Sequence, residues 1–457
     1  MHLPWHNFHF IGIGGIGMSG LASLLLEAGY KVSGSDLNTN ALIERLKAKG
    51  GRVYIGHRAE QVNGAEVVVY SSAVKPDNPE LEMARKKKLP ILSRGELLAL
   101  LMEEKKGIAI AGTHGKTTTS AMIACILEKV GLSPTVIVGG CINNTGTNAW
   151  WGKGEFLVAE ADESDGSFLK LNPYIAVVTN IEADHLDYYQ NLERVVNAFS
   201  QFLRNLRPGG CAIIWGDDER LRLLAKKLNI PHLSFGLTPG QDIEARHLSL
   251  NGAGNQFELY VQGEKVCVVN FPFPGQHNVL NALAAIAVAT ALNIDLEIAT
   301  AALKEFKGVG RRLEIKGEQN GVLVIDDYGH HPTEIKATLR AIKHHWPKRR
   351  LITVFQPHRY SRTLALYPEF LDAFAETDEL ILTEIYAACE KPIAGVSGKW
   401  LAKGVAKRRS VYYCPDFETV LKKLNSMVKE GDIVLTIGAG NIWQVGETFL
   451  EQRLCRI

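Results

Sequence analysis

The clearest chemistry in this 457-residue chain belongs to a short loop flanked by glycines. It consists of Gly112, Thr113, His114, Gly115, Lys116, Thr117 and Thr118. A strand-like stretch (107–111) precedes it and a helical pattern that stops at Gly131 follows, as in phosphate-binding loops, although Ile110 stands where the longer pattern has its first glycine. In such a loop backbone N–H groups hold phosphate oxygens, Lys116 reaches the terminal phosphates and the Thr117 hydroxyl holds Mg²⁺. The loop therefore predicts a nucleoside triphosphate site; the alternative is a lysine in a loop that happens to contain glycines.

A second glycine-rich turn lies near the start of the sequence. Its residues are Gly12, Gly14, Gly15 and Gly17, with Asp36 just after the next strand-like stretch. Glycines allow a pyrophosphate to approach the backbone, N–H groups at a helix start face it, and the Asp36 carboxylate can accept a hydrogen bond from a ribose hydroxyl. Three interpretations stay open: a nucleotide or nucleotide-sugar site, an NAD or FAD site, and a tight turn that serves packing alone. We assign Ser71 and Ser72, which follow the strand-like residues 66–70, to the same site.

An acidic residue and a histidine follow two other strand-like stretches. Glu160 comes directly after residues 156–159, and His185 follows residues 175–179 after a short acidic segment. In a parallel sheet the carboxyl ends of the strands lie along one edge, so both side chains can face the phosphates held by Lys116. A carboxylate is an ordinary Mg²⁺ ligand, whereas hard cations prefer oxygen to histidine nitrogen. We therefore expect Glu160 to bind the metal, and His185 is a metal ligand, a substrate contact or a structural histidine.

Three later motifs place polar side chains between a predicted strand and a predicted helix, or at the start of a helix. They are His277, Asn278 and Asn281 at the helical stretch 279–292; Asp327, Tyr328 and His330 after residues 322–325; and His358, Arg359 and Arg362 after residues 351–355. For Asn278 alone, helix capping is the favoured interpretation. Two arginines on one short turn can bind a carboxylate or a phosphate through paired hydrogen bonds, and a solvated basic turn is the alternative.

The elements that position these motifs predict an α/β protein. Strand-like stretches alternate with helical patterns, which favours parallel sheets with crossover helices. The stretches are 9–13, 66–70, 107–111, 156–159, 175–179, 322–325, 351–355, 380–383 and 433–437. Residues 242–269 are less regular and predict an antiparallel insert. With a linker-like stretch at 304–312, the pattern predicts three domains, residues 1–105, 106–310 and 311–457.

The composition sets aside several classes of protein. The chain is 46% hydrophobic and 22% charged, which is typical of a globular protein, and its formal net charge of +2 points to neither a nucleic acid nor a membrane as a partner. Seven cysteines without a CxxC pair indicate reduced thiols in a cytoplasmic protein. The apolar stretches 10–26 and 279–294 do not fit a signal peptide or a membrane span. We expect a cytoplasmic protein that is neither exported nor inserted into a membrane; its oligomeric state is not predicted.

Seven motifs follow one another along nearly the whole chain. They read GIGGIGMSG, GTHGKTTT, EADESDGSF, TNIEADHLD, GQHNVLNALAA, IDDYGHHPTE and FQPHRYSRT. Together they resemble the Mur ligases, which build the peptide of the bacterial cell wall. The resemblance implies a Rossmann-like N-terminal domain for a UDP-sugar, a central ATPase domain with a phosphate-binding loop and a mostly parallel sheet, and a C-terminal Rossmann-like α/β domain that brings the amino acid.

The resemblance also implies roles for individual residues. The glycines of the first turn and Asp36 would bind UDP-N-acetylmuramate and not NAD. The metal ligands would be Thr117, Glu160 and His185, and the catalytic residues Lys116, Glu160 and His185. The adenosine contacts would be His277, Asn278 and Asn281, with Arg312 and Asp327 completing the nucleotide site upon closure. The amino acid would be bound by Tyr328, His330, His358, Arg359 and Arg362.

The implied reaction is an ATP-dependent ligation. The γ-phosphate of ATP would move to the lactyl carboxylate of UDP-N-acetylmuramate, and the amine of L-alanine would attack the resulting acyl phosphate. The candidate bases are His185 and His330. The first, sixth and seventh motifs favour L-alanine over the alternative within the family, ligation of a tripeptide in wall recycling. Some relatives carry a carbamylated lysine; residues 195–201 contain no lysine, and Phe199 stands in its place.

Two other classes of protein explain only part of the chain. A nicotinamide-dependent oxidoreductase would use the first glycine turn but would leave the Lys116 loop without a purpose. A phosphate-loop switch or motor would use residues 107–131 but neither flanking sheet domain. A ligase accounts for all three.

Overall fold

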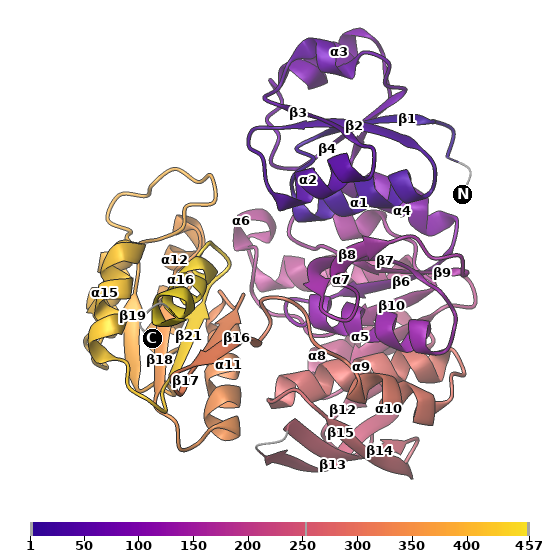
Figure 1. Ribbon diagram of the computed structural model, residues 1–457. Helices are drawn as coiled ribbons and strands as arrows, with labels where there is room; N and C mark the ends of the chain where they lie inside the picture. The colour runs from indigo at the N-terminus through magenta and orange to yellow at the C-terminus, as the bar shows by residue number, and fades with distance from the viewer. Residues whose placement is uncertain (1–2, 252–253, 455–457) are drawn as a thin grey trace. The chain divides into compact units, whose positions relative to one another are not determined.

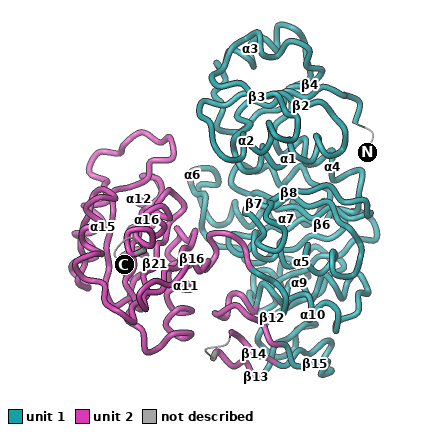
Figure 2. The backbone as a smooth tube through the Cα atoms, viewed as in Figure 1, with its two compact units in different colours: residues 1–246, 258–269, 280–307 teal, residues 247–257, 270–279, 308–457 magenta. Residues whose placement is uncertain are grey.

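The computed structural model describes residues 3–251 and 254–454, and within them the chain forms an α/β fold with three sheets (Figure 1). The chain divides into two compact units (Figure 2). The first comprises residues 1–246, 258–269 and 280–307, and the second comprises residues 247–257, 270–279 and 308–457. The first two sheets belong mainly to the first unit, and the third sheet belongs to the second.

The first sheet is parallel and has the strand order β3-β2-β1-β4-β5. Its strands are β1 (Asn7–Ile11), β2 (Lys31–Asp36), β3 (Arg52–Ile55), β4 (Val67–Tyr70) and β5 (Ile91–Ser93), and its helices are α1 (Ile16–Glu27), α2 (Ala41–Ala48), α3 (Pro79–Lys86) and α4 (Arg94–Glu103), with a 3-10 turn at Ala59–Val62. The strand order reverses between β1 and β4, and ligands of open α/β sheets bind at the carboxyl ends of strands at such a point. The first glycine turn follows β1 and Ser71 follows β4, so both lie there.

The second sheet has the order β15-β14-β13-β12-β11-β10-β6-β9-β7-β8. Its strands are β6 (Lys106–Ala111), β7 (Thr135–Ile142), β8 (Thr147–Trp150), β9 (Phe156–Glu160), β10 (Ile175–Val178), β11 (Cys211–Trp215), β12 (His232–Gly236), β13 (Ile243–Asn251), β14 (Gly254–Val261) and β15 (Glu264–Phe271). The helices around it are η2 (Ser167–Lys170), α5 (Lys116–Lys129), α6 (Leu186–Tyr189), α7 (Leu192–Arg204), α8 (Glu219–Leu228), α9 (Gln276–Ala291) and α10 (Leu296–Lys304). Pairing is parallel from β7 through β9, β6, β10, β11 and β12 to β13, and β8 is antiparallel to β7.

The predicted antiparallel insert is partly right. Strands β14 and β15 are neighbours joined by Gln262 and Gly263, which both have positive φ. A two-residue connection with positive φ at both positions is a type I′ hairpin turn, so these two strands are antiparallel. The first strand of the segment, β13, instead pairs in parallel with β12 and extends the main sheet.

The third sheet has the order β16-β17-β21-β18-β19-β20. Its strands are β16 (Glu314–Gln319), β17 (Val322–Asp327), β18 (Leu351–Phe355), β19 (Glu379–Leu382), β20 (Tyr412–Tyr413) and β21 (Ile433–Ile437), and its helices are α11 (Pro332–His345), α12 (Tyr360–Ala365), α13 (Tyr367–Leu371), α14 (Gly398–Val405), α15 (Phe417–Met427) and α16 (Trp443–Leu454). Strand β16 is antiparallel to β17 and the other pairs are parallel. The sequence did not predict β16. Its charged residues hide the alternation of apolar and polar positions that is typical of a half-exposed edge strand.

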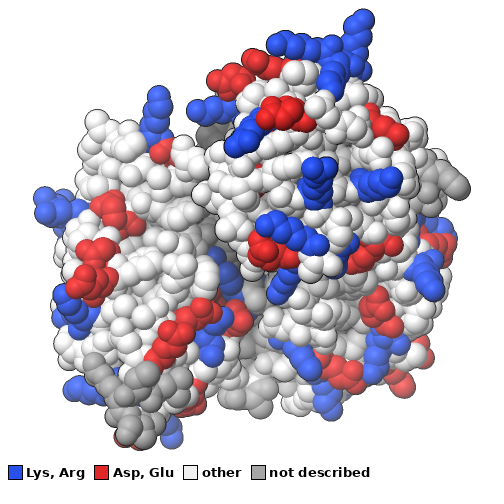
Figure 3. All heavy atoms as spheres, turned by 45° about the horizontal axis from the view of Figure 1, so that its top comes forward, with Lys and Arg blue, Asp and Glu red and all other residues white. Residues whose placement is uncertain are grey.

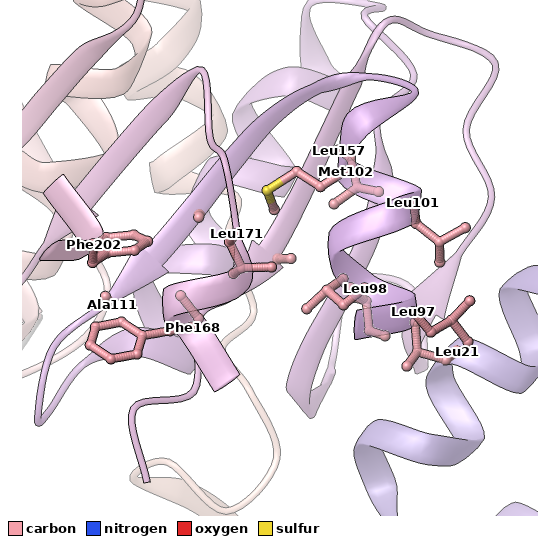
Figure 4. Close-up of a cluster of buried hydrophobic side chains, with 14 of the residues drawn as sticks. Leu21, Leu97, Leu98, Leu101, Met102, Ala111, Leu157, Phe168, Leu171 and Phe202 are labelled. Carbon is pink, nitrogen blue, oxygen red and sulfur yellow. The ribbon is translucent and has the colours of Figure 1, made fainter. Parts of the chain in front are cut away.

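Within the first unit, the first two sheets share one hydrophobic core. Figure 4 shows Leu21 of α1 and Leu97, Leu98 and Leu101 of α4 in one cluster with Phe168 of η2. The two layers approach closely, because a Cβ at Gly95 in α4 would lie 2.6 Å from Cβ of Ser167. The first glycine turn and the phosphate-binding loop therefore stand on a single packed body.

The surface charges and the cysteine thiols agree with what the composition indicates. Basic and acidic side chains alternate over the face shown in Figure 3. Six cysteines fall in the part of the chain that the structure describes, and all six are free thiols. Among the described residues, no helix has the length and apolar character needed to cross a membrane.

Candidate active site

Two glycines give the phosphate-binding loop its shape. Gly112 has φ +133°, and a Cβ there would lie 2.0 Å from Oγ1 of Thr179. Gly115, at the start of α5, has φ +85°, and its Cβ would lie 2.4 Å from Oδ1 of Asn281. Any side chain at either position would meet both strained backbone and a filled space. Asn281, predicted to contact adenosine, thus packs directly on the loop.

The segment after β10 is hydrogen-bonded to the phosphate-binding loop. Thr179 donates its hydroxyl to the carbonyl of His114 at 2.6 Å, and the carboxamide of Asn180 accepts from the His114 N–H at 2.9 Å. The Thr113 hydroxyl accepts from the N–H of Glu182 at 2.8 Å. The TNIEADHLD motif therefore shapes the loop, a role for Thr179 and Asn180 that the sequence did not reveal.

Lys116 is held by the loop and by a buried carboxylate. Its Nζ donates to the carbonyl of Gly112 at 2.5 Å and of Thr113 at 3.2 Å, and lies 2.7 Å from Oε1 of Glu163. Only 3% of the Glu163 side chain is exposed, and its buried Oε2 has no hydrogen-bond partner among the residues that the structure describes. Burial lowers the pKa of Lys116, but neighbouring carboxylates, Glu163 above all, raise it beyond its ordinary value. Burial raises the pKa of Glu163 to about 7.

The expected metal ligands lie at the carboxyl edge of β6, β9 and β10. Thr117 is in the first turn of α5, and Glu160 ends β9 and accepts from the N–H of Gly139 at 2.6 Å. His185 has φ 53°, and its Nε2 lies 3.8 Å from Oε1 of Glu163. Thr117 and Glu160 offer a hydroxyl and a carboxylate, the oxygen donors that Mg²⁺ prefers, and Glu163 is a further carboxylate beside His185. The residues present therefore fit a magnesium ion.

The first glycine turn is closed by the side chains of its neighbours. Asp36 accepts from the Gly14 N–H at 2.8 Å, and Asn40 donates to the Gly14 carbonyl at 3.0 Å. Gly12 has φ +80°, and its Cβ would lie 3.2 Å from Cβ of Ser71. The structure thus brings together Asp36, Ser71 and the glycines, as predicted. The Asp36 carboxylate also stabilises the turn through its hydrogen bond from Gly14.

An arginine that the sequence did not reveal completes this turn. Arg94 packs on Gly17, where a Cβ would lie 3.1 Å from Nη1 of Arg94, and it donates to Asp162 at 2.7 Å. Burial raises the pKa of Asp162, but Arg94 and the surrounding hydrogen bonds lower it to about 2. Gly17 therefore makes room for a guanidinium that joins the first turn to the EADESDGSF motif.

The residues predicted to bind the amino acid form a cluster within the second unit. The ring of His330 lies 5.6 Å from that of Tyr328 and 5.9 Å from that of His358, and Nδ1 of His358 lies 3.3 Å from Nη1 of Arg362. Arg359 and Arg362 are half-buried, which disfavours the solvated basic turn. The ring of Tyr386, which the sequence did not single out, stacks on His358 at 5.6 Å.

This cluster combines positively charged arginines with a neutral imidazole. Burial, together with the positive charges of His330, Arg362 and Arg359, lowers the pKa of His358 to about 3. The imidazole therefore stays uncharged near neutral pH while the arginines remain cationic. Such a cluster suits a carboxylate.

The remaining nucleotide residues of the second unit are held by local contacts. Asn278 lies in the first turn of α9 and donates to the carbonyl of Pro274 at 2.8 Å. An N-cap side chain would instead accept from a backbone N–H, so this bond does not support the capping interpretation. Asp327 accepts from the N–H groups of Leu313 and Gly329, both at 2.8 Å, and burial raises its pKa to about 6 although Arg312 lowers it. The roles of His277, Asn278, Arg312 and Asp327 in one nucleotide site stay predictions.

Three family models match the chain in succession. They are described as the Mur ligase family catalytic domain (residues 7–106), the Mur ligase middle domain (residues 110–289) and the Mur ligase glutamate ligase domain (residues 311–440). The chain belongs to the Mur ligase family. This confirms the resemblance drawn from the seven motifs.

Individual relatives match over nearly the whole length. A UDP-N-acetylmuramate–L-alanine ligase of Geotalea daltonii is 52% identical over 98% of both chains, and one of Geobacter sulfurreducens is 50% identical over 97% of both. The crystal structure of a UDP-N-acetylmuramate-alanine ligase from Thermotoga maritima has a TM-score of 0.85 at 31% identity and covers 99% of this chain and 100% of its own. A murein peptide ligase from Psychrobacter arcticus has a TM-score of 0.75 at 26% identity and covers 99% of both chains. The predicted three-domain α/β architecture is confirmed.

Phe199, which the sequence places where some relatives carry a carbamylated lysine, lies in α7. It is fully buried, with its ring 5.2 Å from that of Phe168. Its equivalence to that lysine stays a prediction. Because the buried Phe199 ring is apolar, it cannot supply a charged group near an acyl phosphate. Glu163, buried beside Lys116 and His185, is a further carboxylate of this site besides Glu160.

Proposed function

We propose that this protein joins L-alanine to the lactyl carboxylate of UDP-N-acetylmuramate at the expense of ATP, through an acyl phosphate, in peptidoglycan biosynthesis. The observation that carries the proposal is the similarity, at about 50% identity over nearly the full chain, to ligases named for this reaction. The TM-score of the solved alanine ligase, 0.85, also exceeds that of the murein peptide ligase, 0.75. Since ATP and UDP-sugars are cytoplasmic metabolites, we assign the reaction to the cytoplasm.

The two glycine loops divide the substrates between them. The first turn leads into the N-terminus of α1, whose partial positive charge suits the diphosphate of the UDP-sugar, and the carboxylate of Asp36 suits its hydroxyls. The second loop carries Lys116 and Thr117, which suit the β- and γ-phosphates of ATP. In the proposed cycle these phosphates replace Glu163 and the loop carbonyls as partners of Lys116.

Mg²⁺ would be held by Thr117, Glu160 and His185, and when bound it offsets charge on the transferring phosphoryl group. Lys116 would contribute a second positive charge from its partly buried position beside Glu163. The carboxylate of the sugar can then attack the γ-phosphorus of ATP, with ADP as the leaving group. The acyl phosphate that forms is a far better electrophile than a free carboxylate.

The second unit would supply the amino acid. Arg359 and Arg362 would hold the carboxylate of L-alanine through charge-assisted hydrogen bonds and orient its amine. The amine must lose a proton before it attacks. Two imidazoles are candidate acceptors, His185 beside Glu163 and His330, whose Nδ1 lies 3.5 Å from Oε2 of Glu334.

The proposal is tested by phosphate release and by the mass of the product, with UDP-N-acetylmuramate and its peptide forms as acceptors and with several amines. We expect ligation of L-alanine to UDP-N-acetylmuramate, weak use of glycine or L-serine, and no dependence on nicotinamide cofactors. Faster ligation of the L-Ala-γ-D-Glu-diaminopimelate tripeptide than of L-alanine would contradict the proposed amino acid. Phosphate release that needs neither acceptor nor amine would contradict ligation itself.

A further inference from the structure

Arg94 is the one side chain described above that touches both the first glycine turn and the acidic motif beside Lys116. It is the first residue of α4, and its guanidinium lies against Gly17 in the first turn of α1. On its other side Nη2 donates to Oδ2 of Asp162 at 2.7 Å. Asp162 stands between Glu160 and Glu163, so Arg94 connects the two proposed substrate sites directly.

Arg94 pairs with one carboxylate, that of Asp162, and lies close to two helix N-termini. The N-terminus of a helix carries partial positive charge, and Arg94 lies at the start of both α1 and α4. The first turn of α1 has no acidic residue, and Glu96 in the first turn of α4 is already bonded to Ser93 and paired with Lys170. A second anion beside Arg94 would relieve this excess of positive charge.

Close packing surrounds the backbone that carries Arg94. A side chain at Gly95 would collide with Ser167, and a Cβ at Gly17 would lie only 3.1 Å from the guanidinium. Asp162 is also held, because its Oδ1 accepts from the N–H of Ser164 at 3.0 Å. Arg94 can therefore exchange one acidic partner for another with little rearrangement of the backbone.

We propose that Arg94 binds the anionic part of the UDP-sugar and in doing so loosens its bond to Asp162. This inference rests on the proposed function and adds a substrate contact to it. Arrival of the acceptor would then change the partners of Asp162, and with them the electrostatics of the segment that faces Lys116. Either the diphosphate or the lactyl carboxylate of the sugar can supply the anion.

The test measures the binding of UDP-N-acetylmuramate by calorimetry in the absence of ATP, metal and amino acid. Arg94→Ala should raise the dissociation constant about tenfold or more, as expected for a lost charge-assisted hydrogen bond. Asp162→Asn should leave the affinity unchanged or increase it, because Arg94 loses a competing partner. Arg85→Ala removes an exposed arginine from α3 in the same domain and is the matched control, with wild-type affinity expected.

The outcomes separate the possible roles of Arg94. Equal dissociation constants for Arg94→Ala and Arg85→Ala would overturn the proposal, and so would an equal loss in Arg94→Ala and Asp162→Asn, which would make Arg94 only a support for Asp162. If Arg94→Ala does not fold, Arg94→Lys and Asp162→Asn still decide, because the first should weaken binding and the second should not.

A second ligand identifies the anion. UDP-N-acetylglucosamine lacks the lactyl carboxylate, so a loss of affinity in Arg94→Ala that persists with this ligand assigns the contact to the diphosphate. A loss confined to UDP-N-acetylmuramate assigns it to the carboxylate. Failure of the wild-type protein to bind either UDP-sugar would contradict the proposed function instead, which keeps the two failures distinct.

Discussion

The two glycine loops of the first unit share a backbone design and differ in where their charge resides. In each, a strand runs into a glycine turn that starts a helix. The space beside the first turn is filled by side chains from elsewhere, Asp36, Ser71 and Arg94. The second loop carries its own charge on Lys116, a flexible side chain that pairs with Glu163. We therefore expect the first loop to bind its ligand in one position, and the Lys116 side chain of the second loop to stay close to the phosphoryl group during its transfer.

The largest effect is expected where the loop charge itself is removed. Lys116→Ala should lower the ligation turnover by about a thousandfold or more, because the positive charge acts on the phosphoryl group during transfer. The unfolding transition should stay cooperative, since Glu163 can remain protonated once its partner is lost. Turnover is measured by product formation at saturating substrates. Lys129→Ala is the control, because Lys129 lies on the same helix but pairs with Glu305 at the surface. A folded Lys116→Ala protein with near-normal turnover would remove the second loop from the chemistry.

Two glycine substitutions, one in each loop, test whether the two loops bind different substrates. A side chain at Gly14 would meet Asp36 at 2.9 Å, and one at Gly115 would meet Asn281 at 2.4 Å. Because misplacement by about 1 Å can cost roughly a hundredfold, Gly14→Val should raise KM for UDP-N-acetylmuramate on that scale and Gly115→Ala should do so for ATP. Each variant should leave KM for the other substrate nearly unchanged. The reverse pattern would mean that the roles of the two loops are exchanged.

Local patterns explain why both loops could be predicted from the sequence. Glycine spacing, a preceding apolar strand and a following helix are all contiguous, and strands β18 and β21 were predicted to the residue for the same reason. The bond between Arg94 and Asp162 joins residues 68 positions apart and leaves no local signal. Glu163 was visible as one acid among several, but its pairing with Lys116 depends on how the acidic segment is buried after β9.

The amino-acid cluster allows a third test in the second unit. Arg362→Ala should raise KM for L-alanine about tenfold to a hundredfold, since a hydrogen bond to a charged group contributes roughly 1.5–3 kcal/mol. KM for ATP and for the UDP-sugar should change little. Arg340→Ala on the exposed face of α11 is the control in the same unit. An Arg362→Ala protein whose defect lies only in KM for ATP would place this arginine at the nucleotide.

The smallest effect concerns the charge state of His358. With its pKa lowered to about 3, the imidazole should show no titration in NMR spectra between about pH 5 and 8. Arg362→Ala should raise this pKa, because one of the positive charges that oppose protonation is lost. The sign for stability follows: as the pH falls below about 6.5, the unfolded chain takes up a proton that the folded chain refuses, so the free energy of unfolding decreases. A His358 signal that titrates near pH 6.5 would contradict the buried, basic setting.

We expect the ligand of the first loop to receive the phosphoryl group held by the second. This transfer is tested by preparing UDP-N-acetylmuramate with ¹⁸O in both oxygens of the lactyl carboxylate and following one turnover with ATP and L-alanine. If the carboxylate becomes an acyl phosphate and the amine then displaces phosphate, each released phosphate carries one ¹⁸O and the amide keeps the other. Mass spectrometry of the phosphate reads this directly. Released phosphate without ¹⁸O, alongside a product that forms normally, would contradict the acyl-phosphate route and the division of labour between the two loops.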